Sequence, residues 1–264
     1  MLRRIRRRVH TALDGYVEKT ANRVHARNAE LAERIIASMR AECDRAVRTV
    51  QEVEFRARRD IFAAGERHAV RTTERFIRKN LPTANSFSDP ILTLRYALSL
   101  APDEGMACEF GVFSGSTLAV IADARAGKDV YGFDSFQGLP EDWRTNIPTG
   151  TFRVDEPPEV PGAELVVGWF DDTLPDFLDS HPGPVAFLHL DADLYSSTKV
   201  VLGQVGSRLR PGSVVVFDEY FNYPGWEEHE HRAWCEFVEA SGVRFEYLCY
   251  TSNSEQLAVR ITEA

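Results

Sequence analysis

The sequence predicts an α/β fold in which a mostly parallel, seven-stranded sheet is covered by helices on both faces and preceded by a helical extension. Short apolar runs typical of buried strands alternate with helical segments between residues 106 and 218. Two further runs, 243–250 and 255–261, follow one another directly and predict a hairpin at the edge of the sheet. Residues 1–80 contain no proline and are rich in Ala, Arg and Glu, which favour helices.

The first 80 residues also differ from the rest of the chain in charge. They contain 20 Lys and Arg against 11 Asp and Glu, whereas the whole chain of 264 residues contains 31 and 40. We expect these residues to form a homo-oligomer through a coiled-coil or helical-hairpin seam, and we place the boundary to the following domain, 81–264, in a turn-rich segment. The seam residues recur at alternating steps of three and four: Ile36, Met39, Cys43, Ala46, Val50, Val53 and Ala57.

Residues 1–10 carry five arginines around an apolar stripe of Leu2, Ile5 and Val9. Two interpretations remain open, contact with an anionic membrane surface or a solvated basic face on an oligomerising helix. Nucleic acid is not expected as a partner, because the chain has no base-reading motif. The lack of a secretory signal and of a long apolar run predicts a cytoplasmic protein, peripheral to the membrane if residues 1–10 bind lipid. Four cysteines without paired spacing agree with a reducing compartment.

A strand, a glycine turn and a helix are predicted between Met106 and Leu118. The glycines at 111 and 115 allow a sharp turn and close approach of a ligand to the backbone. Glu109 at the strand end would repel a pyrophosphate but attract a cationic amino acid end. This carboxylate therefore favours S-adenosylmethionine over a nicotinamide dinucleotide.

The next two strands predict the rest of a nucleoside site. Residues 130–134 end in Asp134, a position from which a carboxylate can accept hydrogen bonds from both ribose hydroxyls. The strand 163–167 is followed by Gly168 and Trp169, where an adenine ring would lie. The alternatives are that Glu109 and Asp134 are only capping or salt-bridged acids, and that Trp169 and Phe170 only seal the core.

A proline-rich segment, 141–162, is too long for a simple connection and is predicted to be a lid over the substrate. The strands 184–191 and 213–218 should lie side by side, which brings Asp191 and the pair Asp218-Glu219 together at their carboxyl ends. Three carboxylates suit a hard divalent ion such as Mg²⁺, which would lower the pKa of an acceptor hydroxyl.

Other groups near these strands have weaker assignments. Asp191 is also the candidate proton acceptor, with His229 as an alternative base. Asp193 lies past the strand end and is the weaker ligand candidate. His189 is expected either to support Asp191 or to be a core histidine. The alternative for Asp218 is that it caps a helix, and the alternative for Glu219 is that it faces solvent.

Five motifs in order resemble the macrocin O-methyltransferase family of class I enzymes: residues 109–115, 132–140, 168–175, 189–195 and 216–220. The resemblance covers about residues 90–262 and implies a Rossmann-like sheet, S-adenosylmethionine as donor, a Mg²⁺-dependent mechanism and a sugar hydroxyl as acceptor. It implies metal binding by Asp191, Asp218 and Glu219. Members of the family often carry a second Asp where this chain has Glu219, and the extension 1–80 is outside the resemblance. The predicted donor-site residues are Glu109, Gly111, Val112, Gly115, Ser116, Asp134, Ser135, Phe136, Gly168, Trp169 and Asp191.

The sequence thus predicts an S-adenosylmethionine-dependent, metal-assisted O-methyltransferase acting on a glycoside or a related small molecule. A nicotinamide-dependent sugar oxidoreductase is disfavoured by Glu109 and by the missing third glycine of a dinucleotide fingerprint. A binding or scaffold protein that keeps the donor without turnover is the alternative from another functional class.

Overall fold

A computed structural model describes residues 2–264, and for residues 2–6, 8 and 9 it describes the backbone only. The predicted membrane contact of residues 1–10 therefore falls largely outside the described side chains. The chain divides into two compact units, one ending at Ala63 and the other running from Ala64 to Ala264. No helix in the described part of the chain is long and apolar enough to cross a membrane.

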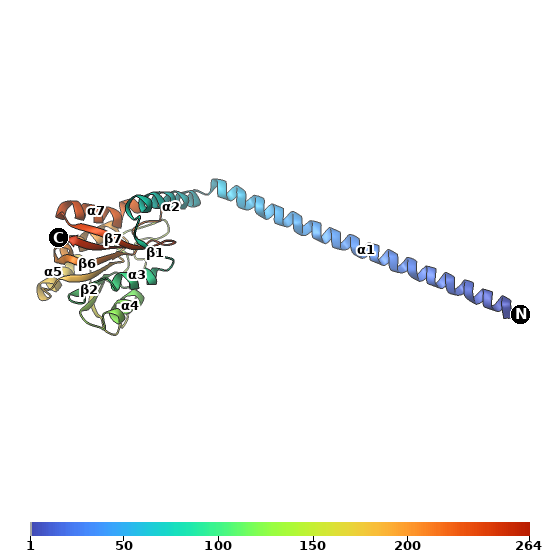
Figure 1. Cartoon of the computed structure of the whole chain (residues 1–264), viewed down its shortest axis with the longest axis horizontal. Helices are drawn as coiled ribbons and strands as arrows, with labels where there is room; N and C mark the ends of the chain where they lie inside the picture. The colour runs from blue at the N-terminus through green and yellow to red at the C-terminus, as the bar shows by residue number, and fades with distance from the viewer. Residues whose placement is uncertain (1) are drawn as a thin grey trace. The chain divides into compact units, whose positions relative to one another are not determined.

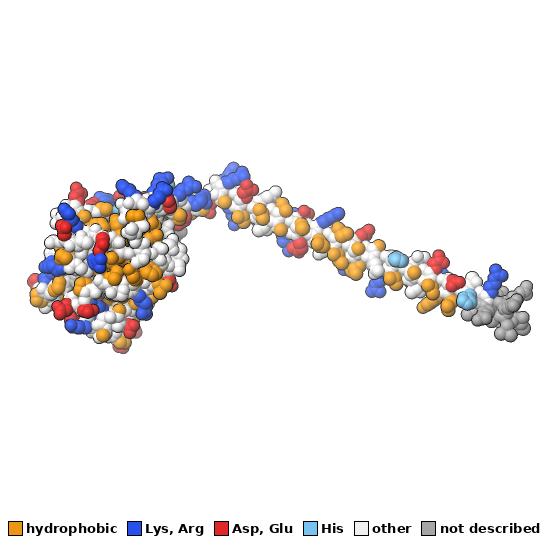
Figure 2. Space-filling model, viewed as in Figure 1, with side chains coloured by type: hydrophobic (Ala, Val, Ile, Leu, Met, Phe, Trp, Pro, Cys, Tyr) orange, Lys and Arg blue, Asp and Glu red, His pale blue; other side chains and the backbone are white. Residues whose placement is uncertain are grey.

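One helix, α1 (Leu2–Arg59), makes up nearly all of the first unit (Figure 1). The predicted seam lies on this uninterrupted helix and does not fold into a hairpin. Its apolar side chains are exposed, for example Met39 at 63% and Val50 at 66%. Figure 2 shows them scattered along α1 between charged side chains. Whether the seam is a coiled coil depends on a partner helix.

The second unit contains an eight-stranded sheet of order β1-β7-β8-β6-β5-β2-β3-β4. The β7–β8 and β6–β8 pairs are antiparallel and the other neighbours are parallel. The hairpin expected from residues 243–261 is therefore present, on the β6 side of the sheet. The strands are β1 (Asn85–Phe87), β2 (Met106–Phe110), β3 (Val130–Asp134), β4 (Glu164–Val167), β5 (Val185–Leu190), β6 (Leu209–Phe217), β7 (Arg244–Thr251) and β8 (Leu257–Glu263).

The strand count exceeds the seven predicted because β1, in the segment taken as a boundary, pairs in parallel with β7. The compact unit also begins before the predicted boundary. Helix α2 (Ile61–Asn80) packs the ring of Phe76 against Tyr220 and Trp226. The Trp226 indole N–H donates to the Thr72 hydroxyl at 3.0 Å. The apolar face of α2 is thus buried against the loops between β6 and α7, so the second compact unit includes most of α2 and begins at Ala64.

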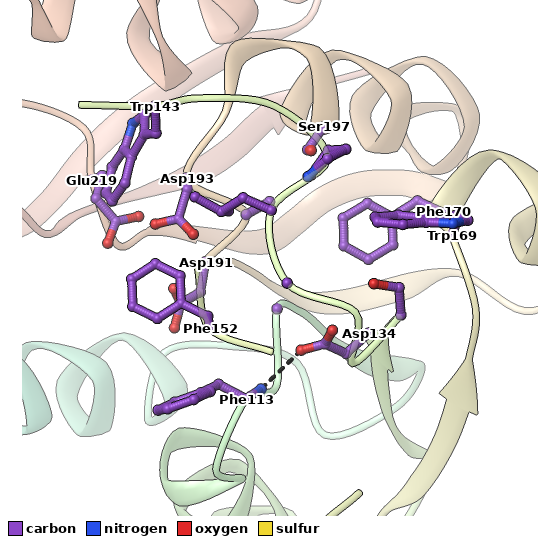
Figure 3. A pocket seen from close by; sticks show the side chains of 16 residues that line it. Phe113, Asp134, Trp143, Phe152, Trp169, Phe170, Asp191, Asp193, Ser197 and Glu219 are labelled. Carbon is purple, nitrogen blue, oxygen red and sulfur yellow. Dashed lines mark hydrogen bonds between the residues drawn. The ribbon is translucent and has the colours of Figure 1, made fainter. Parts of the chain in front are cut away.

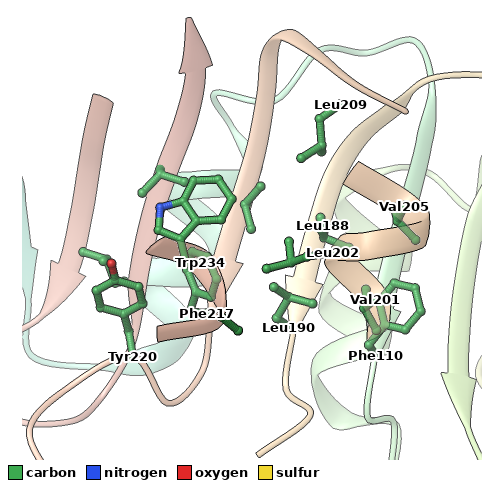
Figure 4. Packing of buried hydrophobic residues seen from close by; sticks show 14 of the residues in the cluster. Phe110, Leu188, Leu190, Val201, Leu202, Val205, Leu209, Phe217, Tyr220 and Trp234 are labelled. Carbon is green, nitrogen blue, oxygen red and sulfur yellow. The ribbon is translucent and has the colours of Figure 1, made fainter. Parts of the chain in front are cut away.

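Helices cover both faces of the sheet, as predicted. One face packs against α2, α5 (Phe170–Ser180), α6 (Tyr195–Val205) and α7 (Glu230–Ser241), and the other against α3 (Pro90–Leu98) and α4 (Ser116–Ala124). Figure 4 shows Leu188 and Leu190 of β5 between β6 and the side chains of α6. Every residue of β5 is buried, as expected for a central parallel strand. Cys108 and Cys249 are buried strand residues, as their sequence context predicts.

The register of the parallel strands determines where the site forms. Phe110 is paired with Phe133 and Leu190, and Leu190 is paired with Phe217. These strands therefore end at one edge of the sheet. The residues that follow them, Gly111, Asp191 and Asp218 among them, come together there although they are far apart in the chain.

Candidate functional site

A cleft of about 900 Å³, including its open mouth, lies at the carboxyl ends of β2, β3, β5 and β6. Ligands of open parallel sheets bind at this edge. Among the described residues that line the cleft there are four acids and no lysine, arginine or histidine. The cleft is therefore electronegative, which suits a cationic ligand and disfavours a pyrophosphate.

The structure brings part of the predicted site together and leaves part of it outside. Gly111, Asp134, Ser135, Trp169, Asp191 and Glu219 line the cleft. The other predicted residues support the surrounding loops and do not line it: Glu109, Val112, Gly115, Ser116, Phe136, Gly168, Asp218 and His229. The lining residues that sequence reasoning assigned weakly or missed include Phe113, Trp143, Phe152, Asp193 and Ser197.

Asp134 holds the glycine turn in place. One of its carboxylate oxygens accepts the backbone N–H groups of Val112 and Phe113, each at 2.9 Å, and the other accepts the N–H of Phe136 at 2.7 Å. Figure 3 shows the bond to Phe113 at the base of the cleft. Val112 and Phe136 thus act through their backbone. A carboxylate has about four acceptor positions, so Asp134 retains about one for a ribose hydroxyl.

Glu109 and Asp218 are engaged by a buried histidine. The ring of His189 lies with Nδ1 2.8 Å from Glu109 and Nε2 3.7 Å from Asp218. Burial lowers the pKa of His189, but contacts with Asp218 and Glu109 outweigh it and raise this pKa well above its ordinary value. The raised pKa favours the protonated form of His189, whose ring lies between Glu109 and Asp218. Glu109 is fully buried and does not line the cleft, and its contact with the donor stays a prediction.

We expect Glu109→Gln to lower the free energy of unfolding by about 3 kcal/mol, because removing one partner of a buried ion pair leaves the other charge uncompensated. Urea denaturation measures the change. The exposed Glu156→Gln is the matched control. The double variant Glu109→Gln/His189→Gln should recover part of the loss. If Glu109→Gln were as stable as the control Glu156→Gln, a structural role for the Glu109–His189 pair would be contradicted.

Three acids from two neighbouring strand ends form the group best placed to hold a metal ion. One carboxylate oxygen from each of Asp191, Asp193 and Glu219 lies within 4.8 Å of the others. Figure 3 shows these side chains gathered on one side of the cleft, opposite Trp169. This group differs from the predicted set, since it contains Asp193 and not Asp218. Asp193 has a left-handed backbone, φ +61°, which turns its side chain back toward the strand end.

The three acids are crowded and poorly solvated. Burial and the nearby Asp218 raise the pKa of Asp191 and of Glu219 well above their ordinary values. Burial also raises the pKa of Asp193 to about 7, although Arg144 opposes the shift. In addition, Oε2 of Glu219 is buried without a hydrogen-bond partner among the described residues. Such a site favours a cation that neutralises the carboxylates and occupies the free oxygen.

The predicted lid is anchored over the cleft. Arg144 makes a bidentate ion pair with Glu255, at 3.1 and 2.6 Å, in the turn between β7 and β8. Its guanidinium also lies 3.9 Å from the ring centroid of Trp143 and 3.5 Å from that of Tyr223. At the mouth, the rings of Phe113 and Phe152 contact each other with centroids 5.7 Å apart. The lid therefore supplies aromatic surface next to the acids.

His229 is placed poorly for the role of alternative base. It precedes α7, its ring lies beside Tyr223, and it does not line the cleft. Burial and the neighbouring Arg144 lower its pKa, so the imidazole is neutral at neutral pH. Asp191 faces the cleft directly and remains the better placed proton acceptor.

Comparison with known proteins identifies the sheet. A family model described as a methyltransferase domain matches residues 108–220, which include the strand ends that build the cleft. Residues 108–220 are thus similar to a methyltransferase domain. The Rossmann-like, class I fold that the five motifs predict is confirmed by the likeness to a solved methyltransferase.

Two relatives of the methyltransferase domain are informative. A *Streptomyces olivaceus* protein named 8-demethyl-8-(2,3-dimethoxy-alpha-L-rhamnosyl)-tetracenomycin-C 4'-O-methyltransferase is 33% identical over 139 residues. The match covers 42% of this chain and 51% of the relative, so the chain spans about half of that protein's length. The crystal structure of a calicheamicin methyltransferase superposes with a TM-score of 0.52 at 24% identity, covering 64% of this chain and 77% of that one. This second likeness establishes the fold.

Proposed function

We propose that the protein transfers the methyl group of S-adenosylmethionine to a hydroxyl of a glycoside or a related small molecule, with the help of a divalent metal ion. The observation that carries the proposal is the group of Asp191, Asp193 and Glu219, which faces a cleft built by a methyltransferase domain. The name of the tetracenomycin relative, a rhamnosyl O-methyltransferase, supports a sugar hydroxyl as acceptor.

The residues of the cleft fit the donor. Gly111 lets the turn after β2 pack directly against the end of β5, since a Cβ there would lie 1.7 Å from the backbone oxygen of Asp191. Asp134 is available for the ribose and Trp169 for the adenine ring, and the absence of basic side chains among the described lining residues suits a sulfonium. Bound S-adenosylmethionine supplies a methyl group on a positively charged sulfur.

The residues on the other side of the cleft fit a hard divalent ion. Carboxylate oxygens are the preferred ligands of Mg²⁺, and Glu219 has an oxygen without a partner. A bound ion supplies positive charge that lowers the pKa of an acceptor hydroxyl. Asp191 then accepts the hydroxyl proton, while the Arg144–Glu255 pair holds the lid closed and limits the access of water.

Addition of Mg²⁺ should stabilise the protein, because the ion relieves repulsion among the three acids. At a concentration a hundredfold above the dissociation constant, the gain is about 2.7 kcal/mol, or roughly 5–10 °C in Tm for a unit of this size. Differential scanning fluorimetry with Mg²⁺ and with EDTA measures it. Glu219→Gln should reduce the shift, whereas the exposed Glu156→Gln should keep it. Identical Tm values with Mg²⁺ and with EDTA in the unaltered protein would contradict the metal site.

Catalysis is tested by following S-adenosylhomocysteine release in the presence of neutral glycosides, with and without Mg²⁺. Metal-stimulated release that depends on the glycoside supports the proposal. Calorimetry with S-adenosylhomocysteine reports donor binding separately. Donor binding without transfer to any offered hydroxyl compound would favour the scaffold alternative.

A further inference from the structure

Helix α1 carries an apolar stripe that extends well beyond the seam predicted between Ile36 and Ala57. Apolar residues continue to recur at steps of three and four toward the N-terminus. Between Leu31 and Cys43 there are three successive steps of four, which shift the heptad pattern once. Asn28 is the one polar residue in the stripe. In this longer stripe Ile35 takes the place of Ile36. The series is Val17, Ala21, Val24, Asn28, Leu31, Ile35, Met39, Cys43, Ala46, Val50 and Val53.

Among the described residues of its own compact unit, no second element covers the large apolar side chains of this stripe. That unit consists almost entirely of α1, and the large apolar side chains of the stripe are about half or more exposed, as for Leu31 at 53% and Val53 at 62%. A helix gains most of its stability in proteins from packing an apolar face, and exposed apolar surface of this extent marks an interaction site. The covering element must itself carry a matching stripe of heptad spacing.

We propose that a second copy of the chain covers this stripe, and that the two α1 helices form a parallel, in-register, two-stranded coiled coil. A second copy supplies the same repeat over the same length, with the same single phase shift in the same place. Steps of four that interrupt a heptad pattern locally unwind a coiled coil, so a partner without the interruption would lose register past Ile35.

Asn28 determines the direction and register of the pair. Asn28 lies between Val24 and Leu31, four residues after the first and three before the second, which is position a of a heptad. A single asparagine at position a specifies register at some cost in stability. In a parallel, in-register pair the two Asn28 amides face each other and can hydrogen-bond. An antiparallel pair with full overlap would place Asn28 opposite Ala46, leaving a desolvated amide without a partner.

The side chains that flank the stripe are compatible with this arrangement. In a parallel, in-register pair, Glu42 of one copy lies opposite Val47 of the other. In the same way, Thr49 lies opposite Glu54. No like charges are opposed there. The parallel arrangement also places the two Cys43 residues opposite each other at position a. A disulfide between them would report the register of the two helices.

The first experiment measures mass by analytical ultracentrifugation of the full chain. We expect a dimer, twice the chain mass of 29.8 kDa. Leu31→Asp/Val50→Asp should convert it to a monomer, because each replacement places a charge in the seam. Ala41→Asp, on the outer face of the same helix, should remain a dimer. A monomeric unaltered protein, or a dimer that survives the two seam charges, overturns the proposal.

The second experiment tests direction and register with the oxidant diamide. Two Cys43 thiols give up their hydrogens to the azo group and form one disulfide, which requires Cα atoms about 4.4–6.8 Å apart. We expect rapid crosslinking to a covalent dimer. Cys43→Ser, which retains the exposed Cys235, should abolish it, and Cys43→Ser/Ala41→Cys should not restore it.

The outcomes of the second experiment separate the competing arrangements. A dimer that diamide does not crosslink through Cys43 is antiparallel or out of register and overturns the proposed geometry. Crosslinking that survives in Cys43→Ser comes from Cys235 and contradicts the assignment. Neither measurement depends on methyl transfer, so the proposed catalytic function can fail while the coiled coil stands.

Discussion

Asp191→Asn should reduce methyl transfer by about a hundredfold or more while leaving the affinity for S-adenosylhomocysteine nearly unchanged. The amide keeps the shape of the side chain but cannot accept the hydroxyl proton, and general-base catalysis contributes about 10²–10⁴-fold. It also removes one negative charge from the group formed with Asp193 and Glu219, which weakens any bound cation. We expect the donor to bind mainly on the opposite side of the cleft, which is lined by Asp134 and Trp169.

Turnover and binding must be measured separately to test this expectation. Single-turnover rates at saturating Mg²⁺ report the chemical step, and calorimetry with S-adenosylhomocysteine reports the donor site. Asp179→Asn changes an exposed acid on α5 and serves as the matched control. If Asp191→Asn retains full activity, another group accepts the proton, and His229 would then be the first candidate to replace.

Gly111→Ala should abolish donor binding and lower the free energy of unfolding by about 4 kcal/mol or more. The added Cβ would lie 1.7 Å from the backbone oxygen of Asp191, a distance that no side-chain adjustment can relieve. Gly111 also has φ +94°, a conformation that residues with a Cβ rarely adopt. Effects of this size are exceptional for single substitutions, and here they follow from two independent causes at one residue.

Urea denaturation and calorimetry with S-adenosylhomocysteine measure the two effects. The control is Gly203→Ala on α6, where a Cβ meets nothing within 4 Å. It should leave donor binding intact and raise stability by up to about 1 kcal/mol, because alanine favours a helix over glycine. Unchanged stability and binding in Gly111→Ala would mean that the turn and the end of β5 are farther apart than described.

Most of the fold was predictable because burial leaves a local signature in parallel strands. The runs at 106–110, 130–134 and 184–191 are mostly apolar, and each forms a strand of that extent or nearly so. The prediction failed where pairing depends on distant residues. β1 is only three residues long and is a strand because β7 offers it a free edge. Similarly, α2 joins the catalytic unit because its apolar face meets the aromatic loops before α7.

The site was predictable at the strand ends and less so in the loops. Asp134, Asp191 and Glu219 could be found because carboxylates directly follow apolar strands. Asp193 would have been a stronger ligand candidate only if its left-handed backbone had been predicted. An aspartate in the sequence is a weak indication of that backbone conformation. Arg144 and Glu255 are 111 positions apart in the chain, and no local pattern connects them.

The sequence by itself determined the order of strands and helices, the glycine turn with its acids, and the heptad spacing of the extension, since each depends on neighbouring residues. Only the tertiary structure decided which acids face the cleft. Glu109 and Asp218 are turned toward His189, whereas Asp193 is turned toward Asp191 and Glu219. The physical reason is that a buried carboxylate takes the orientation in which its charge is compensated, and the compensating groups lie on other strands.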